Sequence, residues 1–157
     1  MLDVEARVTE LGLKIPPPRE RSASKPYDLY VIEGSMLYLS GHIPDIEGEP
    51  PLRGIVGTDL DLTQAQDASR RSVRNILATM RRAVGDLNGV ARIVKVLGLV
   101  QAAPHFTDHP AVINAASQIF VDLWGEDAGR SARSAVGVAS LPLGVPVEIE
   151  LLASLKP

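Results

Sequence analysis

Arg133 and Glu148 stand out as charged side chains in a segment, residues 132–150, that is otherwise made mostly of apolar and small residues. The segment consists of two short runs on either side of a Pro-Gly turn, which predicts a β-hairpin with a four-residue turn at residues 141–144. A guanidinium and a carboxylate on one face of such a hairpin could hold a small molecule between them. The alternative is that both are solvated groups near strand ends, as most surface charges are.

The predicted turn fixes which residues pair across the hairpin, and therefore the face that each side chain occupies. The expected pairs are Val138 with Val147, Val136 with Ile149, and Ser134 with Leu151, which together form an apolar face for helices. The opposite face is expected to hold Arg133, Ala135, Gly137, Glu148, Glu150 and Leu152. On this register Arg133 lies about 13 Å along the strand from the position facing Glu148, at roughly 3.4 Å per residue. A structure with Arg133 and Glu148 on opposite faces would contradict the register.

Hydrophobic periodicity predicts the elements around this segment. Helices are expected at residues 2–13, before the prolines at 16–18, from Thr63 to residues 85–89, and from residues 107–108 to Gly125. Strands are expected at residues 36–40 and 93–100, with a long loop at 45–61. This order predicts an α+β sandwich, with two helices on one face of a mixed sheet. Residues 93–100 show no alternation of polar and apolar side chains, so the sheet face without helices must also be shielded from water. This predicts an oligomer.

The composition is typical of one soluble globular domain: 157 residues, of which 45% are hydrophobic and 22% charged. The net charge of −3 favours neither nucleic acid nor an anionic membrane as partner. With no cysteine, the chain has no disulfide, thiolate metal site or cysteine nucleophile. The first twenty residues contain no uninterrupted apolar run, so we expect a cytoplasmic protein without a signal peptide or membrane span.

Two other groups of residues suggest chemistry less strongly. The arginines within residues 70–75 and at 81–82 could indicate RNA binding, but no aromatic residues are interleaved for stacking, which favours a solvated helix face. His105 and His109 flank Asp108, but they fall before or at the start of the expected helix, which favours surface histidines over a metal site.

Four segments, in this order and spacing, resemble the reactive intermediate deaminase family, RidA/YjgF, formerly called the L-PSP endoribonuclease family. They are LSGHIP at 39–44, INAASQIF at 113–120, ARSAVGVASLP at 132–142, and VPVEIE at 145–150. The resemblance covers roughly residues 25–155. It implies a RidA/YjgF-like domain at 25–157 behind an N-terminal helical extension and proline-rich connector at 1–24, and the added length is similar to the extended bacterial subgroup.

The resemblance implies a chorismate-mutase-like fold that forms homotrimers, with helices outside and a cleft at each subunit interface. Deaminase members hydrolyse 2-imino acids or their enamine tautomers to 2-keto acids and ammonia, without a metal or cofactor. We therefore expect a hydrolase similar to 2-iminobutanoate/2-iminopropanoate deaminases, with a small carboxylate substrate and neither nucleic acid nor membrane as partner. The alternatives are a non-catalytic trimer that binds keto acids, an assembly protein with a vestigial cleft, and an RNA-cleaving or RNA-binding protein.

The resemblance also implies roles for individual residues. Arg133 is similar to the arginine that binds the substrate carboxylate, a task that suits the paired hydrogen bonds of a guanidinium. Glu148 is similar to the glutamate that positions or activates water, and Glu150 is ranked second. The other residues implied to bind substrate are Tyr27, Ser40, Gly41, Asn114 and Ala135.

Two positions depart from the family pattern, and several have ordinary alternatives. Ala135 stands where members commonly have cysteine, which matters little if only the backbone N–H meets substrate. His42 stands where glutamine is common, and it could change the polarity of the pocket. Without the resemblance, Tyr27 is read as a half-buried ring, Ser40 as a turn residue and Asn114 as a surface residue of a helix.

Overall fold

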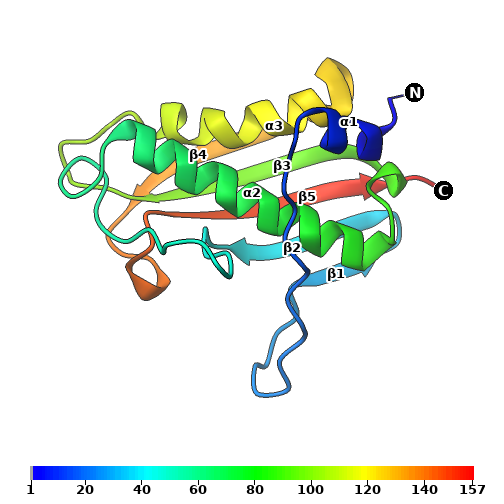
Figure 1. Ribbon diagram of the computed structural model, residues 1–157, viewed down its shortest axis with the longest axis horizontal. Coiled ribbons are helices and arrows are strands. Elements are labelled where there is room, and N and C mark those ends of the chain that lie inside the picture. The colour runs from blue at the N-terminus through cyan, green and yellow to red at the C-terminus, as the bar shows by residue number, and fades with distance from the viewer. Residues whose placement is uncertain (1) are drawn as a thin grey trace.

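The computed structural model describes residues 2–157 as a mixed five-stranded sheet with helices packed on it (Figure 1). The helices are α1 (Val4–Glu10), α2 (Leu62–Val84) and α3 (His109–Gly129), with single 3-10 turns η1 (Leu87–Gly89) and η2 (Pro142–Gly144). The strands are β1 (Tyr30–Glu33), β2 (Met36–His42), β3 (Val90–Gln101), β4 (Ala132–Val138) and β5 (Val147–Leu155), in the spatial order β1-β2-β5-β3-β4. The predicted α+β fold is confirmed, because α2 and α3 cover the same face of the sheet.

Local sequence signals account for the two long helices. Asp61 and Gln64 form a capping box at the start of α2, in which each side chain accepts from the backbone N–H of the other. Gly85 ends α2 with a φ of 80°, a value that favours glycine. Pro110 occupies the first turn of α3, where its missing N–H is tolerated. α3 kinks at Gly125, the predicted end, and continues to Gly129.

The N-terminal helix α1 is shorter than predicted but is attached firmly to the rest of the fold. Its buried residues Val4 and Val8 join the hydrophobic core. The Glu5 carboxylate pairs with Arg81 of α2 and accepts a hydrogen bond from the backbone N–H of Leu87 (3.1 Å). These contacts hold α1, at whose C-terminal end the proline-rich connector begins, against the rest of the fold.

The predicted hairpin of residues 132–150 is wrong. β4 pairs with β3 in parallel, whereas β5 pairs with the other edge of β3 in antiparallel, so β3 lies between the two strands. η2 is therefore a turn within a longer connection and not the turn of a hairpin. The physical reason is α3, which returns the chain alongside β3 and so makes β4 the parallel partner after a helical crossover.

The sheet face that points away from α2 and α3 is rich in apolar side chains. Val31 is opposite Tyr38, which is itself opposite Leu152, and Val136 is opposite Leu99. Val31, Tyr38 and Val136 are 54%, 44% and 43% exposed. Apolar surfaces of this kind are typical of interaction sites. The oligomer expected from the pattern of residues 93–100 stays a prediction.

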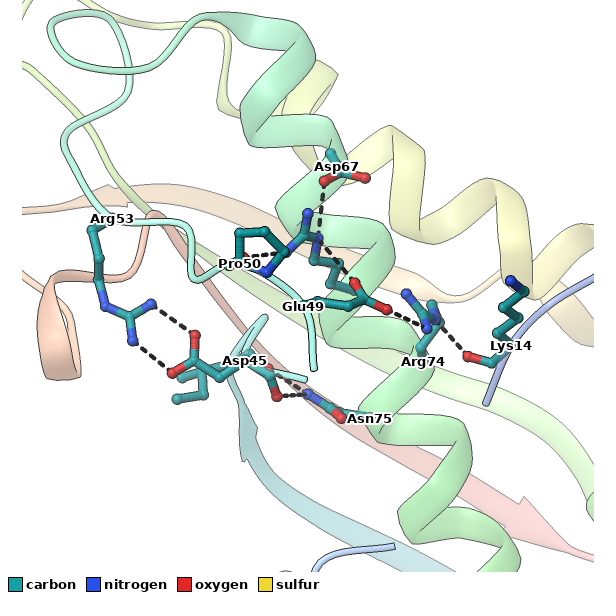
Figure 2. A network of polar contacts seen from close by, with 10 residues as sticks. Lys14, Asp45, Glu49, Pro50, Arg53, Asp67, Arg74 and Asn75 are labelled. Atoms are coloured by element: carbon teal, nitrogen blue, oxygen red, sulfur yellow. Dashed lines mark hydrogen bonds and ion pairs between the residues drawn. The ribbon is translucent and has the colours of Figure 1, made fainter. Parts of the chain in front are cut away.

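A polar network ties the 45–61 loop to α2 (Figure 2). The Arg74 guanidinium pairs with Glu49 (2.7 Å), and Arg71 also lies against this carboxylate (3.5 Å). The Asn75 side chain donates to the backbone carbonyl of Asp45 (2.9 Å). Two of the arginines that could have indicated RNA binding thus hold a loop of the chain itself.

Candidate active site

Tyr27, Gly41 and Glu148 line one cavity of about 370 Å³ beside the end of β2. Pro142 and Leu143 of η2 form another part of its wall. These residues come from four separate segments, so the cavity depends on the assembled fold. Its volume lies in the range of pockets that bind small organic ligands.

A β-bulge in β2 places Gly41 against the Glu148 carboxylate. Leu39 pairs with Leu151 and His42 with Ile149, so Ser40 and Gly41 together oppose the single residue between them on β5. A Cβ atom on Gly41 would lie 2.7 Å from Cδ of Glu148 and still closer to Oε1. Glycine therefore allows the glutamate carboxylate to occupy the space that a side chain would fill.

The environment of Glu148 favours proton exchange. Burial raises the pKa of this carboxyl above its usual range, and the nearby negative charge of Glu150 raises it further. Among residues 2–157, no side-chain or backbone donor hydrogen-bonds to the Glu148 carboxylate. A half-buried carboxylate with a raised pKa and no protein donor is suited to hold a water or a ligand at the cavity.

Ser40 connects the bulge to the segment that carries Tyr27. The Ser40 hydroxyl donates to the backbone carbonyl of Asp28 (2.7 Å), and its backbone N–H donates to the carbonyl of Leu29 (3.0 Å). Tyr27 precedes these anchors and is 53% exposed at the cavity. Ser40 thus positions Tyr27, and its hydroxyl oxygen can still accept a hydrogen bond from a ligand.

His42 supports the bulge from the helix side of the sheet. Its Nδ1 lies 2.6 Å from the Ser40 carbonyl and must donate, so in the neutral ring Nε2 accepts from the Thr79 hydroxyl of α2 (2.8 Å). Burial lowers the pKa of His42 to about 4, which keeps the ring neutral at ordinary pH. His42, which could have changed the polarity of the pocket, therefore lies beneath the pocket wall and does not line the cavity.

Arg133 lies on the opposite face of the sheet from Glu148, which contradicts the predicted register. Its guanidinium donates to Asn114 Oδ1 (2.8 Å) and Ser117 Oγ (3.1 Å), both on α3. Because β4 pairs with β3 and not with β5, its side chains point to the faces opposite to those predicted. Arg133 pairs with Val96, whose buried side chain faces the helices, so Arg133 faces the helices as well. Because the Arg133 and Glu148 side chains lie on opposite faces, the predicted floor of small residues between them is not formed within residues 2–157.

The predicted site residues therefore form two groups. One group lies at the cavity and its bulge: Tyr27, Ser40, Gly41 and Glu148. The other lies at the sheet edge formed by β4 and at α3: Asn114, Arg133 and Ala135.

Two further contributors to the cavity were not predicted from the sequence. The segment between α1 and β1, residues 11–29, which we call the connector from here on, supplies Arg19, Arg21 and Lys25. η2 supplies Leu143, which is 69% exposed with a φ of 58°. No local signal could have placed them there, because a charged segment after a proline run has no periodicity that shows where it packs.

The histidines considered as metal ligands have other contacts. His105 Nε2 lies 3.1 Å from the carbonyl oxygen of Gly57, and His109 packs edge-on against Phe106. Over residues 2–157 there is no group of three or more His, Cys, Asp or Glu side chains that could hold a metal ion.

The fold and the cavity define a small α+β protein with a half-buried carboxylate at a cavity. Residues 5–155 match the family described as "YjgF/chorismate_mutase-like, putative endoribonuclease". The chain belongs to this family, which confirms the resemblance seen in its four segments, while the subgroup stays a prediction.

Individual relatives agree with this membership over nearly the whole chain. Protein TCP17 of Trypanosoma cruzi is 37% identical and covers 98% of this chain and 94% of its own. The crystal structure of Atu1372 from Agrobacterium tumefaciens, a protein of unknown function, is also 37% identical, with a TM-score of 0.87 over 98% of this chain and 94% of that chain.

Two more distant relatives bear on ligand and compartment. The E. coli TdcF structure, which contains bound serine, is 28% identical with a TM-score of 0.62, over 90% of this chain and 94% of that chain. Protein MMF1 of Saccharomyces cerevisiae, described as mitochondrial, is 27% identical over 93% of this chain and 83% of its own. No helix within residues 2–157 is long and apolar enough to cross a membrane.

Proposed function

We propose that this protein hydrolyses small 2-imino acids, or their enamine tautomers, to 2-keto acids and ammonia. The observation that carries the proposal is the Glu148 carboxylate, which faces a small-ligand cavity with a raised pKa and without a protein hydrogen-bond donor. Family membership and the serine bound to TdcF support a small amino-acid-like ligand. Arg133 would bind the substrate carboxylate through paired hydrogen bonds.

The proposed site forms between two copies of the chain, as part of a homotrimer. Arg133 and Glu148 lie on opposite faces of one sheet, so one chain alone does not bring them to the same ligand. β4 is an edge strand, and Val136 on this strand belongs to the apolar face that requires a cover. A second copy placed there would bring its Arg133 and Asn114 to the cavity that holds Tyr27 and Glu148.

The reaction needs one water and one carboxylate that both accepts and returns a proton. The water oxygen bonds to C2 of the protonated imine (C=NH2+) while Glu148 takes one water proton and the C=N electron pair moves to nitrogen, which gives a carbinolamine. Glu148 then returns this proton to the amino nitrogen, and the C–N bond breaks so that ammonia leaves. As the C=O bond of the keto acid forms, the C2 hydroxyl gives its proton to Glu148, which passes it to the ammonia and is ionised again.

The proposal is tested by the release of ammonia and keto acid from an imino acid that an amino-acid oxidase generates in the assay. Arg133→Ala should lower kcat/KM roughly 100-fold, because it removes a charge-assisted contact to the substrate. Arg130→Ala is the matched control, since Arg130 pairs with Glu126 on the surface and should leave the rate unchanged. Equal rates for the wild type and Arg133→Ala would contradict the assignment.

A non-catalytic trimer that binds keto acids is the second candidate, favoured by the ligand-bound TdcF structure. A crystal soaked with 2-oxobutanoate separates the two functions. Ordered ligand at Arg133, together with no hydrolysis above the buffer rate, would support binding without turnover.

RNA is not the ligand that the surface favours. Arg71 and Arg74 lie against Glu49, Arg81 pairs with Glu5, and Arg82 pairs with Glu20. The basic residues of α2 are thereby largely neutralised by acids of the same chain, which weakens an electrostatic footprint for phosphates. We also propose a cytoplasmic location, which cell fractionation tests against the mitochondrial location of the yeast relative.

A further inference from the structure

The connector between α1 and β1 forms one wall of the cavity that contains Glu148. After α1 the chain crosses α2 and descends toward β1 and β2 (Figure 1), and Arg74 holds it there through the carbonyl of Lys14 (2.6 Å). Arg19, Arg21 and Lys25 of this connector line the cavity together with Tyr27. Glu20 of the connector lines it as well, so three cations and one acid of the connector lie around a cavity in which the proposed catalytic group is an anion.

Of the four connector charges that line the cavity, two have charged partners and two do not. Glu20 pairs with Arg82 (2.9 Å), and Arg21 pairs with Asp28 (2.6 Å). Within residues 2–157, neither Arg19 nor Lys25 pairs with a carboxylate.

Both unpaired cations are held in place by uncharged groups. The Arg19 guanidinium donates to the backbone carbonyl of Asp45 (2.7 Å), and Lys25 Nζ lies 5.7 Å from the centroid of the Tyr27 ring. Such contacts orient a cation but leave its charge without an anionic partner. The connector wall of the cavity, formed by residues 19–25, therefore carries the positive charges of Arg19 and Lys25.

We propose that Arg19 and Lys25 form a subsite for a second carboxylate, so that the preferred substrates are 2-imino acids whose side chain ends in a carboxylate. This inference rests on the proposed function, in which Arg133 of another copy binds the first carboxylate. The cavity of about 370 Å³ has room for a ligand larger than a three-carbon acid. A distal carboxylate would be repelled by Glu148, so it binds only where cations offset that charge.

The test compares two stable keto acids of equal chain length, 2-oxoglutarate and 2-oxopentanoate, by isothermal titration calorimetry. The wild type should bind 2-oxoglutarate about tenfold more tightly, and the preference should shrink as salt is added, because exposed charges are screened. Lys25→Gln should weaken 2-oxoglutarate about threefold to fivefold, in the range of an exposed ion pair, and Arg19→Gln with Lys25→Gln should abolish the preference. Binding of 2-oxopentanoate should change less than twofold.

Two control variants separate charge from structure. Lys14→Gln changes a lysine of the same connector that does not line the cavity, and it should retain the preference. Lys25→Arg keeps the charge and should also retain it. If Lys25→Arg behaves like Lys25→Gln, or if the wild type binds both keto acids equally, the subsite is refuted.

Turnover distinguishes failure of the subsite from failure of the proposed function. Imino acids are generated from L-glutamate and L-norvaline by amino-acid oxidases, and their hydrolysis is followed. Equal hydrolysis of both, unaltered in the double variant, would refute the subsite and leave the deaminase standing. No hydrolysis of either, with the binding preference intact, would refute the deaminase and leave the subsite standing.

Discussion

At the scale of single residues, the contact between Gly41 and Glu148 determines where a water could be activated. The bulge adds one unpaired residue to β2, and the missing side chain of Gly41 leaves space for the Glu148 carboxylate. Burial in that place raises the pKa of the carboxyl. One backbone irregularity therefore sets both the position and the basicity of the proposed catalytic group.

Gly41→Ala tests this dependence. The added Cβ would overlap the end of the Glu148 side chain, which is flexible and can move, so the protein should still fold. Because a displacement of about 1 Å can cost roughly 100-fold in rate, kcat should fall by about that factor with little change in Tm. Gly89→Ala is the control, since its Cβ would meet Val84 at an ordinary 3.6 Å. An unchanged kcat in Gly41→Ala would contradict the assigned position of the carboxylate.

His42 makes stability depend on pH in a defined direction. Its pKa is about 4 in the folded chain and about 6.5 when unfolded, so the unfolded state binds more protons between these values. Stability is therefore full above the unfolded pKa and is lost as the pH falls through the folded pKa.

His42→Gln should remove this loss, since glutamine can donate to the Ser40 carbonyl and accept from Thr79 without titrating. Between pH 7 and about 5.5 the wild type should lose about 1 kcal/mol more unfolding free energy than the variant. Urea denaturation at both pH values measures the difference. His105→Gln, at an exposed position, should behave like the wild type, and an equal pH response in all three proteins would contradict the role given to His42.

At the scale of secondary structure, periodicity predicted the helices well and strand pairing poorly. The capping residues and the apolar stripe of α2 are local signals, and they placed this helix to within a residue at its start. The pairing of β4 with β3 and of β5 with both β3 and β2 is decided by the packing of α3, which no local turn preference encodes. A turn at 141–144 was correctly located but was assigned to a hairpin that does not exist.

The dependence of strand pairing on tertiary packing also explains which part of the site was predictable. The Glu148 face of β5 follows from the alternation of buried residues along that strand, whereas the face of β4 depended on its partner. The change of partner strand moved the side chains of Arg133 and Ala135 together to the other face of the sheet, because strand side chains alternate with a period of two. The connector cations were beyond prediction because their position depends on contacts with α2 and the 45–61 loop.

Gln101 at the end of β3 holds η2 in place, a role that strand pairing would have in the predicted hairpin. Its buried side chain accepts from the backbone N–H of Leu141 (2.8 Å) and donates to the carbonyl of Gly54 (3.3 Å). Gln101→Leu leaves that N–H without its acceptor, which should cost about 1–3 kcal/mol. Amide hydrogen exchange at Leu141 should accelerate accordingly, whereas Gln118→Leu on the exposed side of α3 should not affect it. Unchanged exchange would show that η2 is held by other contacts.

At the scale of the whole molecule, the proposed trimer would account for two surfaces at once. The apolar sheet face exposes Val31, Tyr38 and Val136, and the edge strand β4 carries Arg133 away from the cavity of its own chain. A closed ring of copies would cover the first surface and bring each Arg133 to a neighbour's Glu148. Assembly and activity would then depend on the same interface.

Mixing two inactive variants tests the shared site directly. Arg133→Ala and Glu148→Gln should each be nearly inactive alone, because every site lacks either the carboxylate-binding group or the proton acceptor. When equal amounts are unfolded and refolded together, about one quarter of the sites should combine Glu148 from one variant with Arg133 from the other, and hydrolysis should recover to about that fraction of the wild-type rate. A site built within one chain cannot recover, since each chain lacks one of the two groups. Persistent inactivity of mixed oligomers, confirmed by mass spectrometry to contain both variants, would contradict the intersubunit site.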